Sequence, residues 1–452
     1  MSAGSNSLRR AKGAKRKPAK KKRSRARVST EYNMLLTATL CLLALGAVMV
    51  FSASSTTRVL QDGGLSDSAF YLKRTLMFGI VGLIIMHVTA RMGLKAIRDL
   101  TPLLLGVSIF LLVAVLGVGT EVNGATRWIG GGFLQIQPSE LAKVALILYG
   151  ADLLARKPKR ARSLEGFMPF LLVTGASCLL IMLQPDMGTT MVICFSVAAT
   201  LIAAGARPVD LGKIALVIGG LALLMAVVEP YRMARLTSFL SPTSDASGAG
   251  FQAAQAKIAL GSGGLFGVGI GNGVQKAFYL PEAHTDMISA VIGEELGMVG
   301  IAGVVGLFGM FGYAGLKTAQ KAKDNYSKLL VAGLTSLVLV QATINLFAVM
   351  GLAPLTGVPL PFVSYGNSSL LATLFAVGLI LNVARGGKAA AARGSTTGAG
   401  KLRVVQGGRA PAAEKQRRSR ASGAGKAKGR SGGGGNGGAR RTRHGGRRRA
   451  SG

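Results

Sequence analysis

Apolar residues along this chain gather into ten runs of about twenty residues each, separated by polar stretches. A helix needs about 20 apolar residues to cross the ~30 Å hydrocarbon core of a bilayer. The pattern therefore predicts an all-α integral membrane protein with ten transmembrane helices. The runs lie near residues 33–54, 75–93, 101–119, 138–155, 167–185, 187–206, 211–229, 287–315, 328–349 and 368–385.

The composition agrees with a membrane protein. Hydrophobic residues make up 49% of the chain and charged residues 16%, whereas soluble domains carry about 25% charged residues. The net charge of +36 is concentrated at the ends: residues 1–28 hold twelve Lys and Arg and no acid, and residues 385–452 hold nineteen against Glu414. We predict disordered basic tails over 1–28 and 386–452, flanking a membrane domain over 29–385, because the tails lack the apolar side chains of a core.

The distribution of Lys and Arg predicts the orientation in the membrane, because loops rich in these residues stay in the cytoplasm. The loops near residues 91–98, 156–162, 207–213 and 317–328 are the richer set. Both basic tails fall on that side, where anionic lipid is a better partner for them than nucleic acid. We therefore expect both termini in the cytoplasm, and the longest loop, 230–286 between spans 7 and 8, on the outer face.

The long outer loop ends in a polar segment that carries Asp286. A carboxylate at the mouth of a membrane-embedded cavity is costly to keep there and is a functional candidate by default. The alternative is that Asp286 caps the helix predicted to begin near Met287, since Asp is common at helix starts.

The fourth span contains a pair of opposite charges, Glu140 and Lys143, on one helix face. Either charge alone would cost several kcal/mol in hydrocarbon, so we expect them to pair. The pair is either a structural salt bridge or the brace of a polar cavity that holds substrate. Pro138 and Ser139 fit the first turn of this helix, where Pro needs no donor and Ser can cap.

Two outer segments offer groups that suit a sugar phosphate. Trp128 beside Arg127 is either an interfacial anchor, or a flat surface for a sugar ring next to a phosphate ligand. The glycine-rich segment between Lys257 and Lys276 lacks the nucleotide-binding spacings. Its backbone can approach a ligand closely, with the two lysines pairing with phosphate. The alternative is a re-entrant or interfacial loop that uses glycine for packing.

Several site classes are excluded. His87 and His284 are the only histidines outside the tails, which leaves no zinc motif. Outside the basic tails the sequence has no Gly-x-Ser-x-Gly nucleophile motif, so acyl transfer is unsupported.

Six motifs within residues 30–385 together give the chain a specific resemblance: Asn123–Ile129, Gln137–Lys143, Gln184–Gly188, Pro281–Asp286, Gly293–Gly297 and Leu360–Ser369. It resembles the shape, elongation, division and sporulation (SEDS) family of membrane peptidoglycan polymerases, and is more similar to the division branch than to the elongation branch. Asn367 departs from the family pattern, which has glycine there, and we expect this Asn to keep a left-handed turn. Ser368 or Ser369 is an alternative cap of the last span.

The resemblance implies an inverting glycosyltransferase that polymerises lipid II at the outer face of the bacterial cytoplasmic membrane, at the division septum, and releases undecaprenyl pyrophosphate. It implies that Asp286 is the essential aspartate, a role that fits a general base on the acceptor 4-hydroxyl. A class B penicillin-binding transpeptidase and division proteins are the implied partners. We expect no protein metal site, although a divalent cation, Mg or Mn, is an option for the pyrophosphate. The candidate substrate-binding residues are Arg127, Trp128, Glu140, Lys143, Asp186, Lys257, Gln275, Lys276, Glu282, His284, Thr285, Ser364 and Tyr365.

Three alternatives remain at this stage. Ten spans around polar residues also suit a flippase for lipid-linked precursors. The chain could instead be the elongation-type polymerase, or a scaffold that recruits division proteins through its tails.

Overall fold

The computed structural model describes one unit of the chain, the predicted membrane domain, with gaps. The basic tails, 1–28 and 387–452, lie outside the described residues, as do Asn123, Gly124, Pro281 and much of the outer loop. The described residues are 29–61, 69–122, 125–131, 135–156, 158, 163–228, 233, 239, 249–280 and 282–386.

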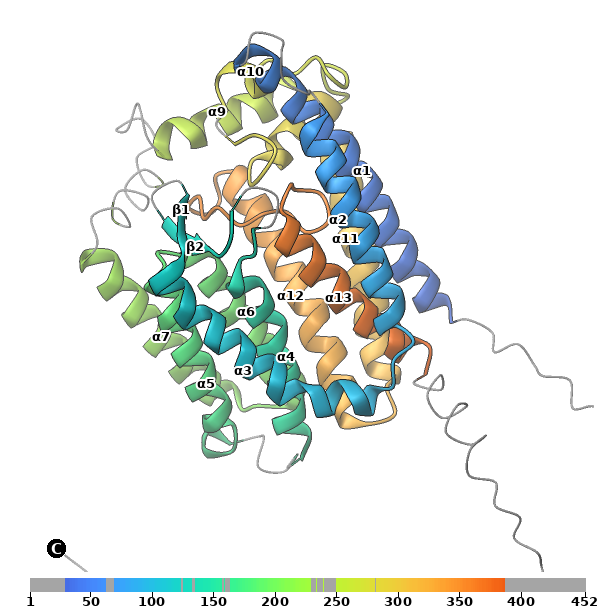
Figure 1. Cartoon of the computed structure of the whole chain (residues 1–452), viewed down its shortest axis with the longest axis vertical. Helices are drawn as coiled ribbons and strands as arrows, with labels where there is room; N and C mark the ends of the chain where they lie inside the picture. The colour runs from blue at the N-terminus through green and yellow to red at the C-terminus, as the bar shows by residue number, and fades with distance from the viewer. Residues whose placement is uncertain are drawn as a thin grey trace, which may run out of the picture. The chain divides into compact units, whose positions relative to one another are not determined.

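Ten helices of 18 residues or more occupy the ten predicted spans within the described residues (Figure 1). Two shorter helices, α9 (Ala249–Ser262) and α10 (Gln275–Phe278), belong to the outer loop. The long helices are α1 (Thr30–Gln61), α2 (Phe70–Thr89), α3 (Leu94–Val118), α4 (Pro138–Arg156), α5 (Leu164–Met182), α6 (Met187–Ala204), α7 (Pro208–Val228), α11 (Ile288–Lys321), α12 (Asn325–Val349) and α13 (Asn367–Ala384).

Eight of these helices are long and apolar enough to cross a membrane, counted over the described residues: α1, α2, α3, α5, α6, α11, α12 and α13. The helical membrane fold is therefore confirmed. Helix α4 does not qualify, and it carries Glu140, Lys143, Asp152 and Arg156. That α4 and α7 also cross the membrane stays a prediction, and so does the total of ten spans.

A short antiparallel hairpin joins α3 to α4, where the sequence predicted only a loop. Strand β1 (Thr120–Val122) pairs with β2 (Ala125–Trp128), with Glu121 opposite Thr126. Thr120 donates a hydrogen bond from its hydroxyl to the carbonyl of Trp128, at 3.2 Å. The hairpin fixes Arg127 and Trp128 on one short, ordered element.

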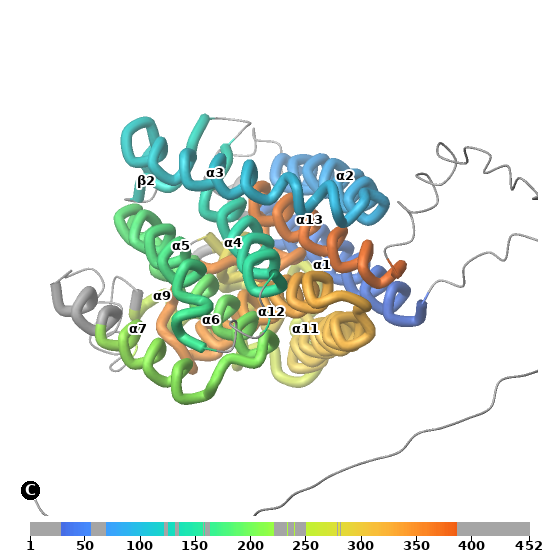
Figure 2. Tube along the Cα trace, turned by 90° about the horizontal axis from the view of Figure 1, so that it is seen from below, coloured from blue at the N-terminus to red at the C-terminus, as the bar shows by residue number. Residues whose placement is uncertain are grey.

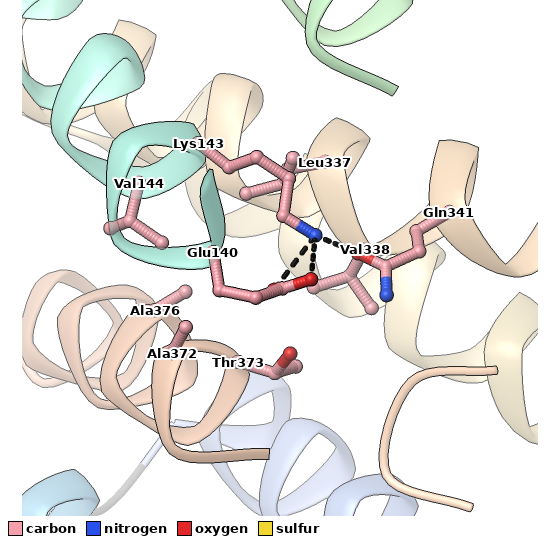
Figure 3. Close-up of a pocket in the computed structure, with 9 residues that line it drawn as sticks. All are labelled: Glu140, Lys143, Val144, Leu337, Val338, Gln341, Ala372, Thr373 and Ala376. Carbon is pink, nitrogen blue, oxygen red and sulfur yellow. Dashed lines mark hydrogen bonds and ion pairs between the residues drawn. The ribbon is translucent and has the colours of Figure 1, made fainter. Parts of the chain in front are cut away.

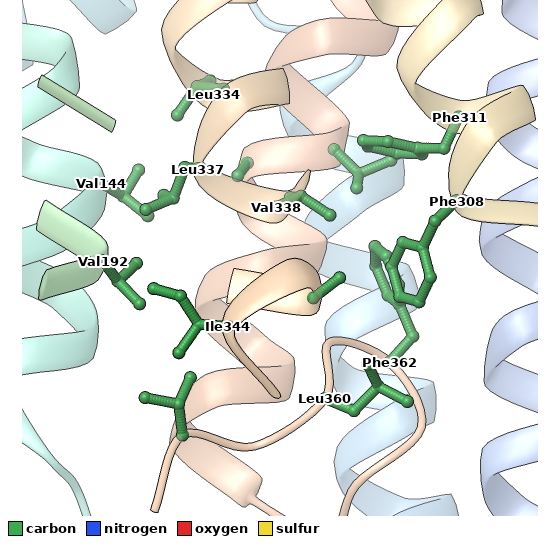
Figure 4. Packing of buried hydrophobic residues seen from close by; sticks show 14 of the residues in the cluster. Val144, Val192, Phe308, Phe311, Leu334, Leu337, Val338, Ile344, Leu360 and Phe362 are labelled. Carbon is green, nitrogen blue, oxygen red and sulfur yellow. The ribbon is translucent and has the colours of Figure 1, made fainter. Parts of the chain in front are cut away.

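Helix α12 lies at the centre of the bundle and contacts α4, α6, α11 and α13 (Figure 2). In its span 72% of the residues are buried, against 22% in α3, which faces outward. One face of α12 packs against Val144 and Val192, and another packs toward Phe308 and Phe362 (Figure 4). The polar side chains of Thr335, Gln341 and Asn345 on α12 are therefore buried in the interior.

Contacts between helix ends show which of them lie at the same end of the bundle. Ser29 donates to the carbonyl of Ala384 at 3.2 Å, and Lys321 pairs with Glu31 at 2.6 Å. The beginning of α1 and the ends of α11 and α13 therefore share one end, as expected if both tails leave on the same side. Asp286 precedes the opposite end of α11. Which end faces the cytoplasm stays a prediction.

Candidate functional site

Asp286 lies in the turn before α11. The helix begins at Ile288, and its capping position is held by Met287, which makes no side-chain cap bond. The alternative role of Asp286 as the cap residue is therefore wrong. The Asp286 side chain is half-buried, and its Oδ1 accepts a hydrogen bond from the hydroxyl of Thr285 at 3.1 Å.

The Asp286 turn is anchored on both sides. Ala283 and Met287 are 3% and 1% exposed, so they hold the turn in the core. The carbonyl of Asp286 accepts a hydrogen bond from Asn345 of α12 at 2.7 Å. Across from the carboxylate lies Gly357, where a Cβ would come within 3.9 Å of Asp286 Oδ2. The carboxylate thus lies close to the segment before α13.

His284 is held by two aromatic rings. Its ring centroid lies 4.4 Å from that of Tyr71 on α2 and 5.4 Å from that of Tyr365. The Tyr365 N–H donates to the carbonyl of His284 at 2.9 Å. Burial raises the pKa of Tyr365, so its hydroxyl keeps its proton and can donate. Two predicted candidates, His284 and Tyr365, are therefore brought together beside Asp286, and Tyr71 is a third partner that the sequence did not indicate.

Other candidates near Asp286 have local structural roles. Ser364 is buried, and its Oγ accepts the N–H of Leu360 at 2.8 Å, which closes a turn. Glu282 is exposed, and one carboxylate oxygen lies 3.8 Å from His284 Nε2. Thr285 donates to the Glu282 carbonyl at 2.9 Å. Of this group, Glu282 presents its side chain most openly to a ligand.

The start of α13 differs from the prediction. Asn367 is the first helical residue, and it is not among the non-Gly residues with positive φ in the described part of the chain, which are Pro185, Glu282 and Phe362. The expectation of a left-handed turn at Asn367 is therefore wrong. In the amide orientation of Asn367 that satisfies both its oxygen and its NH₂ group, the oxygen accepts a hydrogen bond from Arg74 Nε at 3.0 Å. Arg74 thus ties α2 to α13.

Ser368 and Ser369 do not cap α13, because Gly366 holds the capping position. Ser368 accepts the N–H of Gln137 at 3.1 Å and donates to the carbonyl of Gln135 at 3.2 Å. It therefore fastens the segment before α4 to α13. The other predicted cap, Ser139 of α4, is buried and has no hydrogen-bond partner among the described residues.

Arg127 and Asp186 hold the hairpin and the turn between α5 and α6. Arg127 donates to the carbonyl of Gln184 at 3.0 Å and to that of Pro185. Asp186 caps α6 by accepting the N–H of Thr189 at 3.0 Å, and it accepts from Gln137 at 3.2 Å. The geometry favours structural roles for both side chains, because their hydrogen-bonding groups already face protein atoms. Trp128 is half-buried on β2.

Lys276 lies in a buried ion pair, which argues against the predicted contact with a phosphate. Its ammonium pairs with Glu295 of α11, and the two side chains are 1% and 0% exposed. It also donates to Ser52 of α1 at 2.9 Å, and Ser52 donates to the Glu295 carboxylate at 2.7 Å. This buried triad joins α1, α10 and α11. Gln275 likewise donates its N–H to Glu294 at 3.2 Å, whereas Lys257 is exposed and stays available to an anion.

The glycine-rich segment packs against a break in α11, which supports the packing alternative over a phosphate cradle. Gly297 interrupts α11 with φ 67° and ψ −162°. On one side of the break, Val268 and Gly269 donate to the carbonyls of Glu294 and Glu295 at 3.0 and 3.1 Å. On the other side, Met298 and Val299 donate to the carbonyls of Gly264 and Leu265, at 3.0 and 3.2 Å. The segment thereby satisfies backbone groups that a broken membrane helix would otherwise leave unpaired.

Gly267→Ala should destabilise the protein strongly. A Cβ at this position would lie 2.1 Å from the carbonyl oxygen of Glu295, and the φ of +80° is unfavourable for alanine. Gly271→Ala is a matched control, because its φ is +91° but no atom lies within 4 Å of the added Cβ. The control should lose only the stability that alanine costs at a positive φ, about 1–3 kcal/mol. Thermal unfolding in detergent measures both variants, and equal losses would contradict the close packing.

The Glu140–Lys143 pair is present and buried (Figure 3). The ammonium lies 2.8 Å from the carboxylate, the side chains are 4% and 3% exposed, and Gln341 of α12 accepts from Lys143 at 2.9 Å. The adjoining cavity has a volume of about 10 Å³, room for about one water molecule. The geometry therefore favours the structural salt bridge over contact with a substrate.

The described residues offer no protein metal centre. No three side chains of His, Cys, Asp or Glu come together among them. A Mg or Mn ion on a pyrophosphate is usually held by one or two carboxylates together with the phosphates, so that option stays a prediction.

Sequence reasoning missed Asn345 and Gln341, which hold the segments around Asp286. Both are polar residues inside the predicted span 328–349, four positions apart on one helix face. Polar side chains in a span commonly bond to neighbouring elements, so this spacing was an available signal. Tyr71 gave no such signal.

Comparisons with known proteins cover most of the chain. The family model FTSW_RODA_SPOVE, described as "Cell cycle protein", matches residues 32–389. The "Probable peptidoglycan glycosyltransferase FtsW" of Trichlorobacter lovleyi is 41% identical over 364 residues, which is 80% of this chain and 95% of that protein. "Stage V sporulation protein E" of Bacillus subtilis is 42% identical over 357 residues, 78% of this chain and 96% of that protein.

Two solved structures share the fold. One chain, from a study of "Structural coordination of polymerization and crosslinking by a peptidoglycan synthase complex", superposes with a TM-score of 0.64 at 29% identity, covering 78% of this chain and 96% of that one. The rod shape determining protein RodA of Thermus thermophilus superposes with a TM-score of 0.57 at 30% identity, covering 78% and 95%.

Proposed function

This chain belongs to the FtsW, RodA and SpoVE family of cell cycle proteins, and we propose that, as a peptidoglycan glycosyltransferase of cell division, it uses Asp286 as its general base. The substrate in this proposal is lipid II. The observation that carries it is a half-buried carboxylate, one residue before the capping position of α11, on a turn fixed by α2, α12 and the segment before α13. A base must be held within about 3 Å of the proton that it removes, and this turn can provide such a position.

The proposed step is a single displacement. The 4-hydroxyl of the acceptor sugar attacks the anomeric carbon of the donor, Asp286 takes the hydroxyl proton, and undecaprenyl pyrophosphate leaves. One displacement inverts the anomeric configuration without a covalent sugar–enzyme intermediate. Pyrophosphate is already a good leaving group, so the step needs no strong acid.

The charge of the leaving group requires a cation near the site. Lys257 is the exposed candidate, and it lies against Gly351 at the end of α12, where a Cβ would meet its Cε. Arg127 and Lys276 already bond to other residues of the protein, the Gln184 carbonyl and the Glu295 carboxylate. We therefore assign electrostatic stabilisation of the pyrophosphate to Lys257, and contact with the sugars to Glu282 and His284.

The proposal extends to partners and location. The chain has no cross-linking site of its own in this proposal and works beside a class B penicillin-binding transpeptidase, in line with the described synthase complex of its structural relative. It acts in the cytoplasmic membrane at the septum, with its basic tails, which lie outside the described residues, against anionic lipid.

The function is tested with purified protein and labelled lipid II in detergent or vesicles. Polymer that lysozyme digests is the expected product, with loss of the lipid carrier as pyrophosphate. Transfer of lipid II between leaflets without polymer would overturn the proposal in favour of a flippase.

A further inference from the structure

Asn345 makes three hydrogen bonds in the centre of the bundle. It is 2% exposed, on α12. Its Nδ2 donates to the carbonyl of Asp286 at 2.7 Å and to that of Val358 at 2.8 Å, and its Oδ1 accepts from the hydroxyl of Ser289 at 2.6 Å. One side chain thereby joins the Asp286 turn, the first turn of α11 and the segment before α13.

These bonds converge on the position of one carboxylate. Val358 follows Gly357, the residue that faces Asp286 Oδ2, so Asn345 holds the backbone on both sides of that carboxylate. We propose that Asn345 is a positioning residue that fixes Asp286 for proton transfer. This inference rests on the proposed function of Asp286 as the base.

An amide is suited to this position. Two backbone carbonyls must each receive a donor in a region that excludes water, and an amide NH₂ supplies two donors while its oxygen accepts a third bond. A carboxylate of the same shape would repel both carbonyls, and an apolar side chain would leave them unpaired. Gln341, one turn earlier on α12, acts similarly by donating to the carbonyl of Pro359 at 3.0 Å.

A small displacement of Asp286 should slow the reaction, because misplacing a reacting group by about 1 Å can cost about 100-fold in rate. The test compares Asn345→Ala with Asn382→Ala. Asn382 is 3% exposed and donates to the carbonyls of Thr89, at 2.8 Å, and Met92, so it loses comparable buried bonds away from Asp286.

We expect Asn345→Ala to lower kcat for lipid II polymerisation by about 10–100-fold, with KM changed less than about twofold, since the lost interaction acts on the transition state. Asn382→Ala should lower the unfolding temperature similarly but keep kcat, per folded protein, within about twofold. If Asn345→Ala does not fold, Asn345→Ser, which retains one donor, takes its place and should lose less kcat. Equal kcat losses in the Asn345 and Asn382 variants would overturn the inference, as would a change confined to KM.

A double variant separates this inference from the proposed function. If Asp286→Asn is inactive, adding Asn345→Ala should cause no further loss of the residual rate, because positioning matters only while the base is present. A further loss equal to that in the wild-type background would overturn the positioning role alone. Retained polymerisation by Asp286→Asn would instead overturn the proposed function.

Discussion

Asp286→Asn should lower lipid II polymerisation by about 10²–10⁴-fold, the contribution of a positioned general base, while the protein stays folded. Asparagine keeps the size of the side chain, and its oxygen can still accept the hydrogen bond from Thr285. It has no basic oxygen to take the proton of the acceptor hydroxyl. Because Met287 and not Asp286 holds the capping position of α11, the helix should not be weakened.

The measurement is the initial rate of polymer formation from labelled lipid II, normalised to folded protein. Glu121→Gln is a matched control, since it neutralises an exposed carboxylate on β1 that holds no role in the site. The control should polymerise at the wild-type rate. Wild-type activity in Asp286→Asn would exclude Asp286 as the base, whereas an equal loss in Glu121→Gln would indicate a general effect of charge.

Lys276→Met should destabilise the protein by about 3–5 kcal/mol, the cost of leaving one member of a buried ion pair uncompensated. The Glu295 carboxylate is 0% exposed and would retain only the hydroxyl of Ser52 among the partners described here. The triad joins α1, α10 and α11, so its loss should also loosen the glycine-rich segment, which bonds to the backbone of Glu294 and Glu295.

The double variant, Lys276→Met with Glu295→Gln, is the control for this second prediction. Removing both charges should restore much of the lost stability, because replacing a buried pair by neutral groups is often nearly neutral. Thermal unfolding in detergent measures the three proteins. A double variant that is less stable than Lys276→Met would show that contacts other than the ion pair dominate.

The membrane fold was predictable from the sequence because hydrocarbon imposes a length and a composition on each span. The ten apolar runs match ten long helices, including the turn at 184–186 between α5 and α6. The Glu140–Lys143 pair was also predictable, since three-residue spacing on a helix and the cost of a lone charge leave few other partners. The importance of Asp286 came from its motif and its place between spans.

The environment of the other charged residues depended on the tertiary structure. Lys276 and Arg127 were predicted to bind phosphate, as basic residues in an outer loop, but Glu295 of α11 and the carbonyls of Gln184 and Pro185 are their partners. No local pattern specifies contacts between residues this far apart in the sequence. The break at Gly297 could not be predicted for the same reason, because its backbone groups bond to residues that lie 26 or 34 positions earlier in the chain.

By itself, the sequence determined that this protein is a helical membrane protein of the polymerase family, with one acidic residue singled out, since hydrophobic length and motif order are properties of the chain. Only the tertiary structure decided which polar groups remain open to a ligand. Burial is costly for an unpaired charge, and packing brought partners to Lys276, Asp186 and Lys143. It left the Asp286 carboxylate half-buried on a turn fixed by Asn345 and His284.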